Sequence, residues 1–359
     1  MFYHLLYPFH TELSWLNVFR YITFRSIGCA VTAFLIVVLL GPRFIAWLQK
    51  KHYGQVIRDD GPESHFSKKG VPTMGGMLIL AAMTGSVLLW TDLKSGLVWL
   101  LIGISLFFGF IGSMDDIKKI RKGNSRGLTA REKLVLQVFG ALVVGIFLLL
   151  SPGYDGVLSL PFFKSFHPNL GWWYVPFAVV VVVGASNAVN LTDGLDGLAT
   201  GPIVITASTY LIFSYVAGNA VVASYLQIPF VSGAGEVTIY CASIVGACLG
   251  FLWFNCYPAE IFMGDVGSLS LGGTLGVISI ITKQEFLLVI VGGIFVMEAL
   301  SVILQVGYFK MTGGKRIFLM APFHHHYEKK GWLEPKVVVR FWIISIILGL
   351  IALATLKLR

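Results

Sequence analysis

Ten long runs of apolar residues follow one another along the chain, and most of the charged residues lie between them. A helix needs about 20 mostly apolar residues, each rising about 1.5 Å, to cross the hydrocarbon core of a bilayer. The runs cover approximately residues 24–48, 72–91, 95–114, 132–151, 172–190, 198–218, 236–256, 264–282, 286–309 and 337–357. The pattern predicts an all-α polytopic membrane protein with about ten transmembrane helices.

The composition indicates a chain whose outer surface faces lipid. Hydrophobic residues make up 56% of the sequence and charged residues 13%, and the mean hydropathy is +0.79. An average soluble domain has about 25% charged residues, so this chain has too few charges to cover a water-exposed surface of its size. Because we find no internal repeat, low-complexity tract or long linker, we expect residues 1–359 to form a single integral membrane domain.

The basic residues predict the orientation of the helices. The net charge is +9, and 20 of the 27 Lys and Arg residues fall in segments 43–70, 115–133 and 310–340, which follow odd-numbered runs. By the positive-inside rule these loops are cytoplasmic, and both termini are periplasmic. Basic residues that alternate with membrane spans do not form the continuous basic face of a nucleic-acid-binding protein, so we expect no nucleic-acid partner.

The same assignment gathers the distinctive polar motifs on one side of the membrane. The acids near positions 115, 193 and 265 and the three histidines at 324–326 all fall in odd-numbered loops or at the adjoining helix ends. Loops of the opposite side, such as 151–171, are polar but carry no comparable motif. We therefore expect a catalytic cleft at the cytoplasmic face.

Two adjacent acids, Asp115 and Asp116, follow the third run and precede Lys118 and Lys119. Neighbouring carboxylates at a membrane boundary repel each other and are costly unless a cation offsets them. Mg²⁺ is one candidate, because it prefers oxygen ligands and often binds carboxylates together with substrate phosphates. Simple pairing with the nearby basic residues on a solvated loop is the alternative, and this motif alone does not separate the two.

Asn187, Asn190, Asp193 and Asp196 follow one another at intervals of three residues. This spacing places their side chains on one stripe for as long as the helix continues. The alternative is an ordinary helix-ending turn, in which Asp and Gly are common. Two amides and two acids at one spacing favour a polar binding surface.

Asp265 lies near the start of the eighth run, after Pro258 ends the preceding helix. An acid at this position suits the helix dipole and the free N–H groups of the first turn, so capping and metal binding are both open. Phe262, just before it, is either an interface anchor or a flat face on which a base can stack.

Two further motifs are polar. In His324-His325-His326, three successive imidazoles point in different directions, so contacts to phosphate or sugar fit better than a single three-histidine metal site. A solvated basic loop is the alternative. The segment from Lys68 to Gly76 is either an anion-binding loop or a basic flank followed by a small-residue packing face.

Three further polar residues within the apolar runs are Glu298, Gln305 and Arg25. Glu298 and Gln305 are seven residues apart and share roughly one face of the ninth helix. An acid inside the membrane is a functional candidate, but we expect Glu298 only to bond a neighbouring helix. We expect Arg25, at the outer end of the first run, to extend toward the headgroups.

Together these motifs resemble those of the polyprenyl-phosphate N-acetylhexosamine-1-phosphate transferases. The resemblance covers nearly the whole chain and rests on PTMGG (72–76), DDIKK (115–119), NAVNLTDGLDGLA (187–199), FMGDVGS (262–268) and APFHHHYE (321–328). The two Asp motifs belong to the superfamily, whereas the triple histidine with PTMGG is more particular to the branch that uses UDP-MurNAc-pentapeptide.

The resemblance implies a Mg²⁺-dependent transfer of phospho-MurNAc-pentapeptide from UDP-MurNAc-pentapeptide to undecaprenyl phosphate, which yields lipid I and UMP. This is the first membrane step of peptidoglycan synthesis. The resemblance also implies a multi-pass protein of the bacterial inner membrane, with ten spanning helices, and commonly a homodimer. The absence of GxxxxGK[ST], GxGxxG, HExxH and GxSxG from the sequence leaves the ATPase, Rossmann, zinc-protease and α/β-hydrolase classes without their usual support.

On this resemblance Asp115, Asp116 and Asp265 are the catalytic and metal-binding residues. We hypothesise that Asp265 coordinates Mg²⁺ and that Asp115 acts as the base or orienter for the lipid phosphate; a phospho-aspartate intermediate remains open. The substrate-binding candidates are Lys68, Lys119 and Lys133, which would balance phosphate charge, and Thr73, Asn187, Asn190, Asp193, Asp196, Asn255, Phe262, Ser268, Gln305, His324, His325 and His326. In this family the region around Asp196 and Phe262 holds the uridine.

Two alternatives stay open. A related transferase that uses UDP-GlcNAc would share most of the motifs. A secondary transporter would usually bind its solute near the bilayer midplane, on broken helices related by repeats. Acids gathered at one face, in a sequence without a detectable repeat, disfavour the transporter.

Overall fold

The computed structural model describes residues 1–51, 53–54, 70–123, 127–161 and 166–357. Within these ranges the protein is helical, and its only β-type pairings are two isolated bridges, Gly54 with Pro72 and Val157 with Asn169. Nine of the described helices are long and apolar enough to cross a membrane. The expectation of an all-helical polytopic membrane protein is therefore confirmed.

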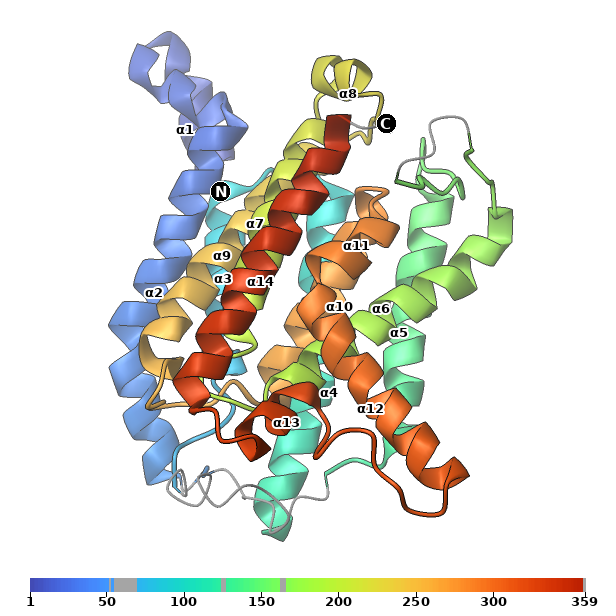
Figure 1. The fold of residues 1–359 in the computed structure, drawn as a ribbon. Helices are drawn as coiled ribbons and strands as arrows, with labels where there is room; N and C mark the ends of the chain where they lie inside the picture. Colours follow the sequence, from blue (N-terminus) through green and yellow to red (C-terminus); the bar gives the residue numbers. More distant parts are fainter. Residues whose placement is uncertain (52, 55–69, 124–126, 162–165, 358–359) are drawn as a thin grey trace.

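The long helices run side by side through the molecule (Figure 1). The α-helices are α1 (Phe2–Leu6), α2 (Ile22–Lys50), α3 (Gly76–Trp90), α4 (Gly96–Lys122), α5 (Ala130–Leu150), α6 (Tyr174–Thr192), α7 (Thr200–Ala217), α8 (Ala220–Leu226), α9 (Ala234–Asn255), α10 (Gly264–Ile281), α11 (Glu285–Val291), α12 (Gly293–Met311), α13 (Phe323–Lys329) and α14 (Glu334–Ala354). In Figure 1, α13 lies at the lower end of the bundle, whereas α1, α8 and the last turns of α14 lie at the upper end.

Three predicted spans differ from the observed helices, and one of them is α4, which continues beyond the predicted end at residue 114 to Lys122. The second run forms α3, an apolar helix of 15 residues that is shorter than the nine candidate spans. The ninth run was predicted as one helix over 286–309, and this was wrong: it divides into α11 and α12 at Gly292. Gly292 and Gly293 are adjacent, and a pair of glycines weakens a helix enough to allow a sharp change of direction. Below this break α12 leans away from the other helices (Figure 1).

Helix α10 is the centre of the bundle, since every residue from Val266 to Ile281 is buried. Glycines allow α3 and α4 to reach its first turn. A β-carbon on Gly76 of α3 would lie 2.1 Å from the backbone nitrogen of Gly267, and one on Gly112 of α4 would lie 2.2 Å from the carbonyl oxygen of Asp265. Small residues permit this close approach of backbones in membrane bundles.

Arg25 does not extend toward the headgroups, so that expectation was wrong. Its side chain is only 4% exposed and forms a two-point ion pair with Glu236 at the start of α9, with N–O distances of 2.7 and 3.0 Å. A carboxylate within reach on the adjacent helix gives the guanidinium a charge-assisted fork of hydrogen bonds inside the protein. The pair therefore joins α2 to α9.

Candidate active site

Two motifs that are far apart in the sequence are joined by backbone hydrogen bonds. The N–H of Phe262 donates to the carbonyl oxygen of Pro72 at 2.8 Å. In the other direction, the N–H of Gly75 donates to the carbonyl oxygen of Phe262 at 2.8 Å, and the N–H of Gly76 donates to the carbonyl oxygen of Met263 at 2.9 Å. These bonds hold the first turns of α3 and α10 together, and so they determine where Asp265 lies.

The adjacent acids of α4 meet Asp265 at this point. The third run was predicted to end at residue 114, but α4 continues to Lys122, so Asp115 and Asp116 are part of the helix and are buried. Asp116 accepts a hydrogen bond from the N–H of Val266 at 3.2 Å, and Asp115 accepts one from Leu128 at 2.8 Å. One carboxylate oxygen from each of Asp115, Asp116 and Asp265 lies within 4.8 Å of the other two.

Two lysines approach this carboxylate cluster, which we define as Asp115, Asp116 and Asp265. The Nζ atom of Lys119 lies 2.6 Å from Asp115, 3.8 Å from Asp116 and 3.1 Å from Asp265. Lys133, at the start of α5, lies 2.6 Å from Asp265. Three carboxyl groups thus face two lysines. Oxygen donors in this number are the ligands that Mg²⁺ prefers, so the residues present fit that ion.

The polar stripe predicted on α6 is correct only in its first half. Asn190 donates hydrogen bonds to Asp265 at 3.0 Å and to Ser268 at 2.8 Å. Asn187, one turn earlier, donates to Gln137 at 2.9 Å. The helix ends at Thr192, so the side chains of the later two acids leave the stripe.

Asp193 and Asp196 lie instead in the turn after α6. Burial, together with the negative charges of Asp265 and Asp196, raises the pKa of Asp193 to about 7. Asp196 is buried: its carboxylate accepts the N–H of Ala259 at 3.0 Å, and its own N–H donates to Glu334 at 2.7 Å. Asp196 therefore joins three chain segments and shapes the loop before α10.

Asn255 also supports that loop. It is buried, accepts a hydrogen bond from Thr200 at 2.9 Å and donates one to the carbonyl oxygen of Ile261 at 2.9 Å. Phe262, which follows Ile261 in the sequence, is partly exposed. The loop thus presents an aromatic residue at the same end of the bundle as the carboxylate cluster.

The three histidines lie on α13 and have three different environments, as their spacing predicted. His324 is buried beside Glu298 of α12, so the expected bond from Glu298 to a neighbouring helix is confirmed. His325 lies 2.6 Å from Glu328, and His326 accepts the N–H of Leu319 at 3.1 Å. Burial lowers the pKa of His326, and the nearby charge of Lys330 lowers it further.

The other predicted residues are distributed as follows. Thr73 is buried just before α3, and Ser268 bonds to Asn190 in the first turns of α10. Gln305 accepts the N–H groups of Ile317 and Phe318 and holds the segment that leads to α13. Lys68 lies outside the described residues.

Two polar residues were missed in the sequence. Gln137 is buried in α5 and orients Asn187. A polar residue inside an apolar run, one turn after Lys133, was the signal that could have identified it. Glu334, which bonds to Asp196, lies within the basic segment 310–340 and carried no comparable signal.

The fold and the site define a polytopic membrane protein with a carboxylate–lysine cluster at one end of its helix bundle. Residues 98–283, a segment that contains all three carboxylates, match the model of glycosyl transferase family 4.

Relatives match over the full length of both chains. The chain is 68% identical to the phospho-N-acetylmuramoyl-pentapeptide-transferase of Desulfotalea psychrophila, over 100% of each. It is 58% and 59% identical to the enzymes of the same name from Syntrophus aciditrophicus and Pelobacter propionicus, again over 100% of each. The chain therefore belongs to glycosyl transferase family 4 and, within it, to the phospho-N-acetylmuramoyl-pentapeptide-transferases.

Proposed function

We propose that this protein transfers phospho-MurNAc-pentapeptide from UDP-MurNAc-pentapeptide to undecaprenyl phosphate and releases UMP. The observation that carries the proposal is the convergence of Asp115, Asp116 and Asp265 with two lysines. A second support is the 68% identity, over the full length of both chains, to the phospho-N-acetylmuramoyl-pentapeptide-transferase of Desulfotalea psychrophila.

The proposed reaction is a phosphoryl transfer. An oxygen of the lipid phosphate attacks the phosphorus that carries the sugar, and a new phosphorus–oxygen bond forms. The bond between that phosphorus and the bridging oxygen breaks, and its electron pair leaves with UMP. Such reactions depend mainly on positioning and on neutralisation of charge. A site at a helix-bundle end suits them, because a lipid phosphate at the bilayer surface can meet a soluble nucleotide there.

The residues of the cluster have separable roles in this proposal. Lys119 and Lys133 stabilise phosphate charge, since their ammonium groups already approach the carboxylates. Asp265, with Asp115 and Asp116 beside it, would hold Mg²⁺, which supplies charge neutralisation for the diphosphate when bound. Asp115 orients the lipid phosphate, or acts as its base. Asn190 fixes one oxygen of Asp265 through its amide.

The proposal extends to the cellular setting. We infer a multi-pass protein of the bacterial inner membrane with the carboxylate cluster on the cytoplasmic side and both termini on the periplasmic side. The basic loops beside α4 and α13 support this orientation by the positive-inside rule. A homodimer, implied by the family resemblance, remains a prediction.

The test is a transfer assay with purified protein, undecaprenyl phosphate and Mg²⁺, in which UDP-MurNAc-pentapeptide and UDP-GlcNAc compete. We expect UMP release and a lipid-linked product with UDP-MurNAc-pentapeptide and not with UDP-GlcNAc. Both products should be lost when EDTA removes the divalent ion. UMP release only with UDP-GlcNAc would identify the related transferase instead. Solute uptake into vesicles without UMP release would support a transporter and contradict the proposal.

A further inference from the structure

Helix α12 carries a fully buried carboxylate that belongs neither to the carboxylate cluster nor to the lysines around it. Glu298 is 0% exposed. Its Oε1 accepts the backbone N–H of His324 at 3.1 Å, and its Oε2 lies 3.2 Å from Nδ1 of the same histidine. A buried carboxylate is costly unless a partner compensates its charge. Both contacts of Glu298 go to one residue, so its local role is to hold His324.

The opposite nitrogen of the same ring has no such partner. The side chain of His324 is 1% exposed. Its Nδ1 lies near Glu298 without a hydrogen bond of good geometry, and its Nε2 has neither a charged neighbour nor a hydrogen bond among the described residues. A β-carbon on Gly194 would lie 2.4 Å from this Nε2 atom, so the ring faces the turn after α6. Buried polar atoms are rarely left unsatisfied, and an isolated exception requires an explanation such as a missing ligand.

That turn also reaches the carboxylate cluster. Asp193, the neighbour of Gly194, interacts with the backbone N–H of Gly264 and with the charge of Asp265. A continuous series of contacts therefore runs from Glu298 through His324 and the turn at Gly194 to the first residues of α10. Nothing in the carboxylate cluster itself requires this connection.

We propose that Glu298 is a positioning residue for binding of the nucleotide sugar. Its carboxylate retains the proton on Nδ1 of His324, and this leaves Nε2 as an acceptor for a hydroxyl or amide N–H of the bound donor. A carboxylate that fixes the tautomer and direction of an imidazole in this way is a recurring arrangement in catalytic and metal sites. The inference rests on the proposed function, because it assigns the missing ligand of Nε2 to the donor substrate.

The test compares Glu298→Gln with Glu285→Gln in the full-length protein. Glu285 is also a buried carboxylate, but it lies at the other end of α10 and bonds to Tyr174. Glu298→Gln should raise the KM for UDP-MurNAc-pentapeptide by roughly 10- to 100-fold, the effect typical of residues that orient a ligand-binding side chain. The KM for undecaprenyl phosphate should not change, and Glu285→Gln should change neither value.

A double-mutant comparison separates positioning from a purely structural role. If Glu298 acts through His324, adding Glu298→Gln to His324→Ala should raise the donor KM no further than His324→Ala alone. Glu298→Asp, which keeps the charge, should give a donor KM between those of the wild type and Glu298→Gln. If Glu298→Gln does not fold, as judged by thermal unfolding and size exclusion, Glu298→Asp replaces it in the double mutant.

The outcomes distinguish this inference from the proposed function. A wild-type protein that releases no UMP would refute the function. An active wild type whose donor KM is unchanged by Glu298→Gln, or fully additive effects in the double mutant, would overturn only the positioning role.

Discussion

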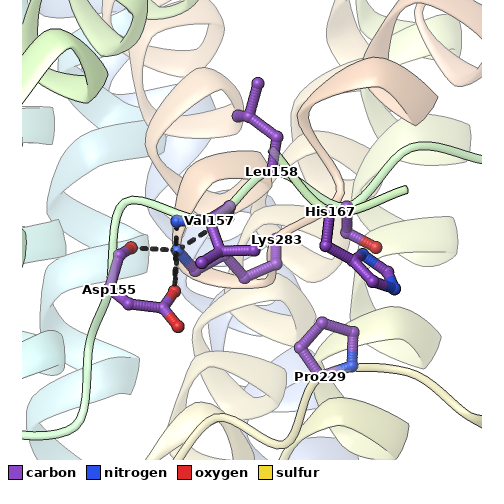
Figure 2. Close-up of a pocket in the computed structure, with 7 residues that line it drawn as sticks. Asp155, Val157, Leu158, His167, Pro229 and Lys283 are labelled. Atoms are coloured by element: carbon purple, nitrogen blue, oxygen red, sulfur yellow. Dashed lines mark hydrogen bonds and ion pairs between the residues drawn. The ribbon is translucent and has the colours of Figure 1, made fainter. Parts of the chain in front are cut away.

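Helix α10 has a lysine–carboxylate contact at each of its ends, and the two differ in how their charges are balanced. At its start Asp265 meets two other carboxylates and two lysines. Just after its end, Lys283 contacts Asp155 through both a carboxylate oxygen, at 3.0 Å, and the backbone carbonyl, and lies 3.3 Å from the carbonyl oxygen of Val157 (Figure 2). Its Nζ is also 3.8 Å from the centre of the Tyr154 ring.

The difference shows what separates an ion pair that supports the fold from one that can bind a ligand. Lys283 has one acid, two carbonyl oxygens and an aromatic face, which together satisfy a single ammonium group. Burial nevertheless lowers its pKa, because the charged form loses water. The adjacent cavity is only about 60 Å³ and is lined by Asp155, Val157, Leu158, Ser159, His167, Pro229 and Lys283 (Figure 2). It has room for water molecules and not for a nucleotide.

The carboxylate cluster, by contrast, has more acids than bases. Under the proposed function, a divalent cation and the phosphates of the substrates would join these charges. The comparison can be tested by altering the two ends in parallel.

The largest effect is expected from Asp265→Asn. The amide keeps the shape of the side chain but removes the charge that Lys119 and Lys133 share and that would bind the proposed divalent ion. Turnover should fall by about 100-fold or more, as for other groups that stabilise transferred charge. UMP release measures this effect. Asp155→Asn at the opposite end is the matched control and should retain wild-type turnover; equal losses in both variants would remove the distinction between the ends.

A smaller effect is expected from Lys133→Met. This change removes one of the two ammonium groups while it preserves the length and burial of the side chain. Turnover should fall roughly 10- to 100-fold, because the lysine acts beside a ligand-binding carboxylate. Lys118→Met is the control, since among the described residues Lys118 pairs with Glu132, at 3.5 Å, outside the cluster. Turnover that is preserved in Lys133→Met would exclude this lysine from charge stabilisation.

The smallest effect on turnover is expected from Lys283→Met. Asp155 is 64% exposed and can be solvated once the lysine is gone, so the main loss is that of the buried hydrogen bonds. We expect destabilisation of about 1–3 kcal/mol, which lowers the unfolding midpoint by several degrees, with UMP release almost unchanged. A calorimetric scan beside the transfer assay checks both. Strong loss of turnover in a folded variant would mean that the two ends of α10 are coupled.

Motifs in the sequence predicted that three distant carboxylates meet, but not where every other polar candidate lies. Asp115, Asp116 and Asp265 were predicted to lie together, and they do. The stripe from Asn187 to Asp196 was predicted by helical spacing and failed where α6 ends at Thr192. Spacing describes a helix only as long as the helix lasts. The Asp and Gly residues from 193 to 197 are common in helix-ending turns, so the alternative interpretation was correct for this half of the motif.

The amino-acid sequence by itself determined the helical membrane architecture, because the length of an apolar run and the placement of basic residues act through residue type alone. Only the tertiary structure decided which polar groups are partners. Lys133 and Asp265 are 132 positions apart, and Arg25 and Glu236 are 211 apart. Such pairs depend on how glycine-lined helices pack against one another, α4 against α10 and α9 against α2. Packing is a property of surfaces in contact rather than of neighbouring residues.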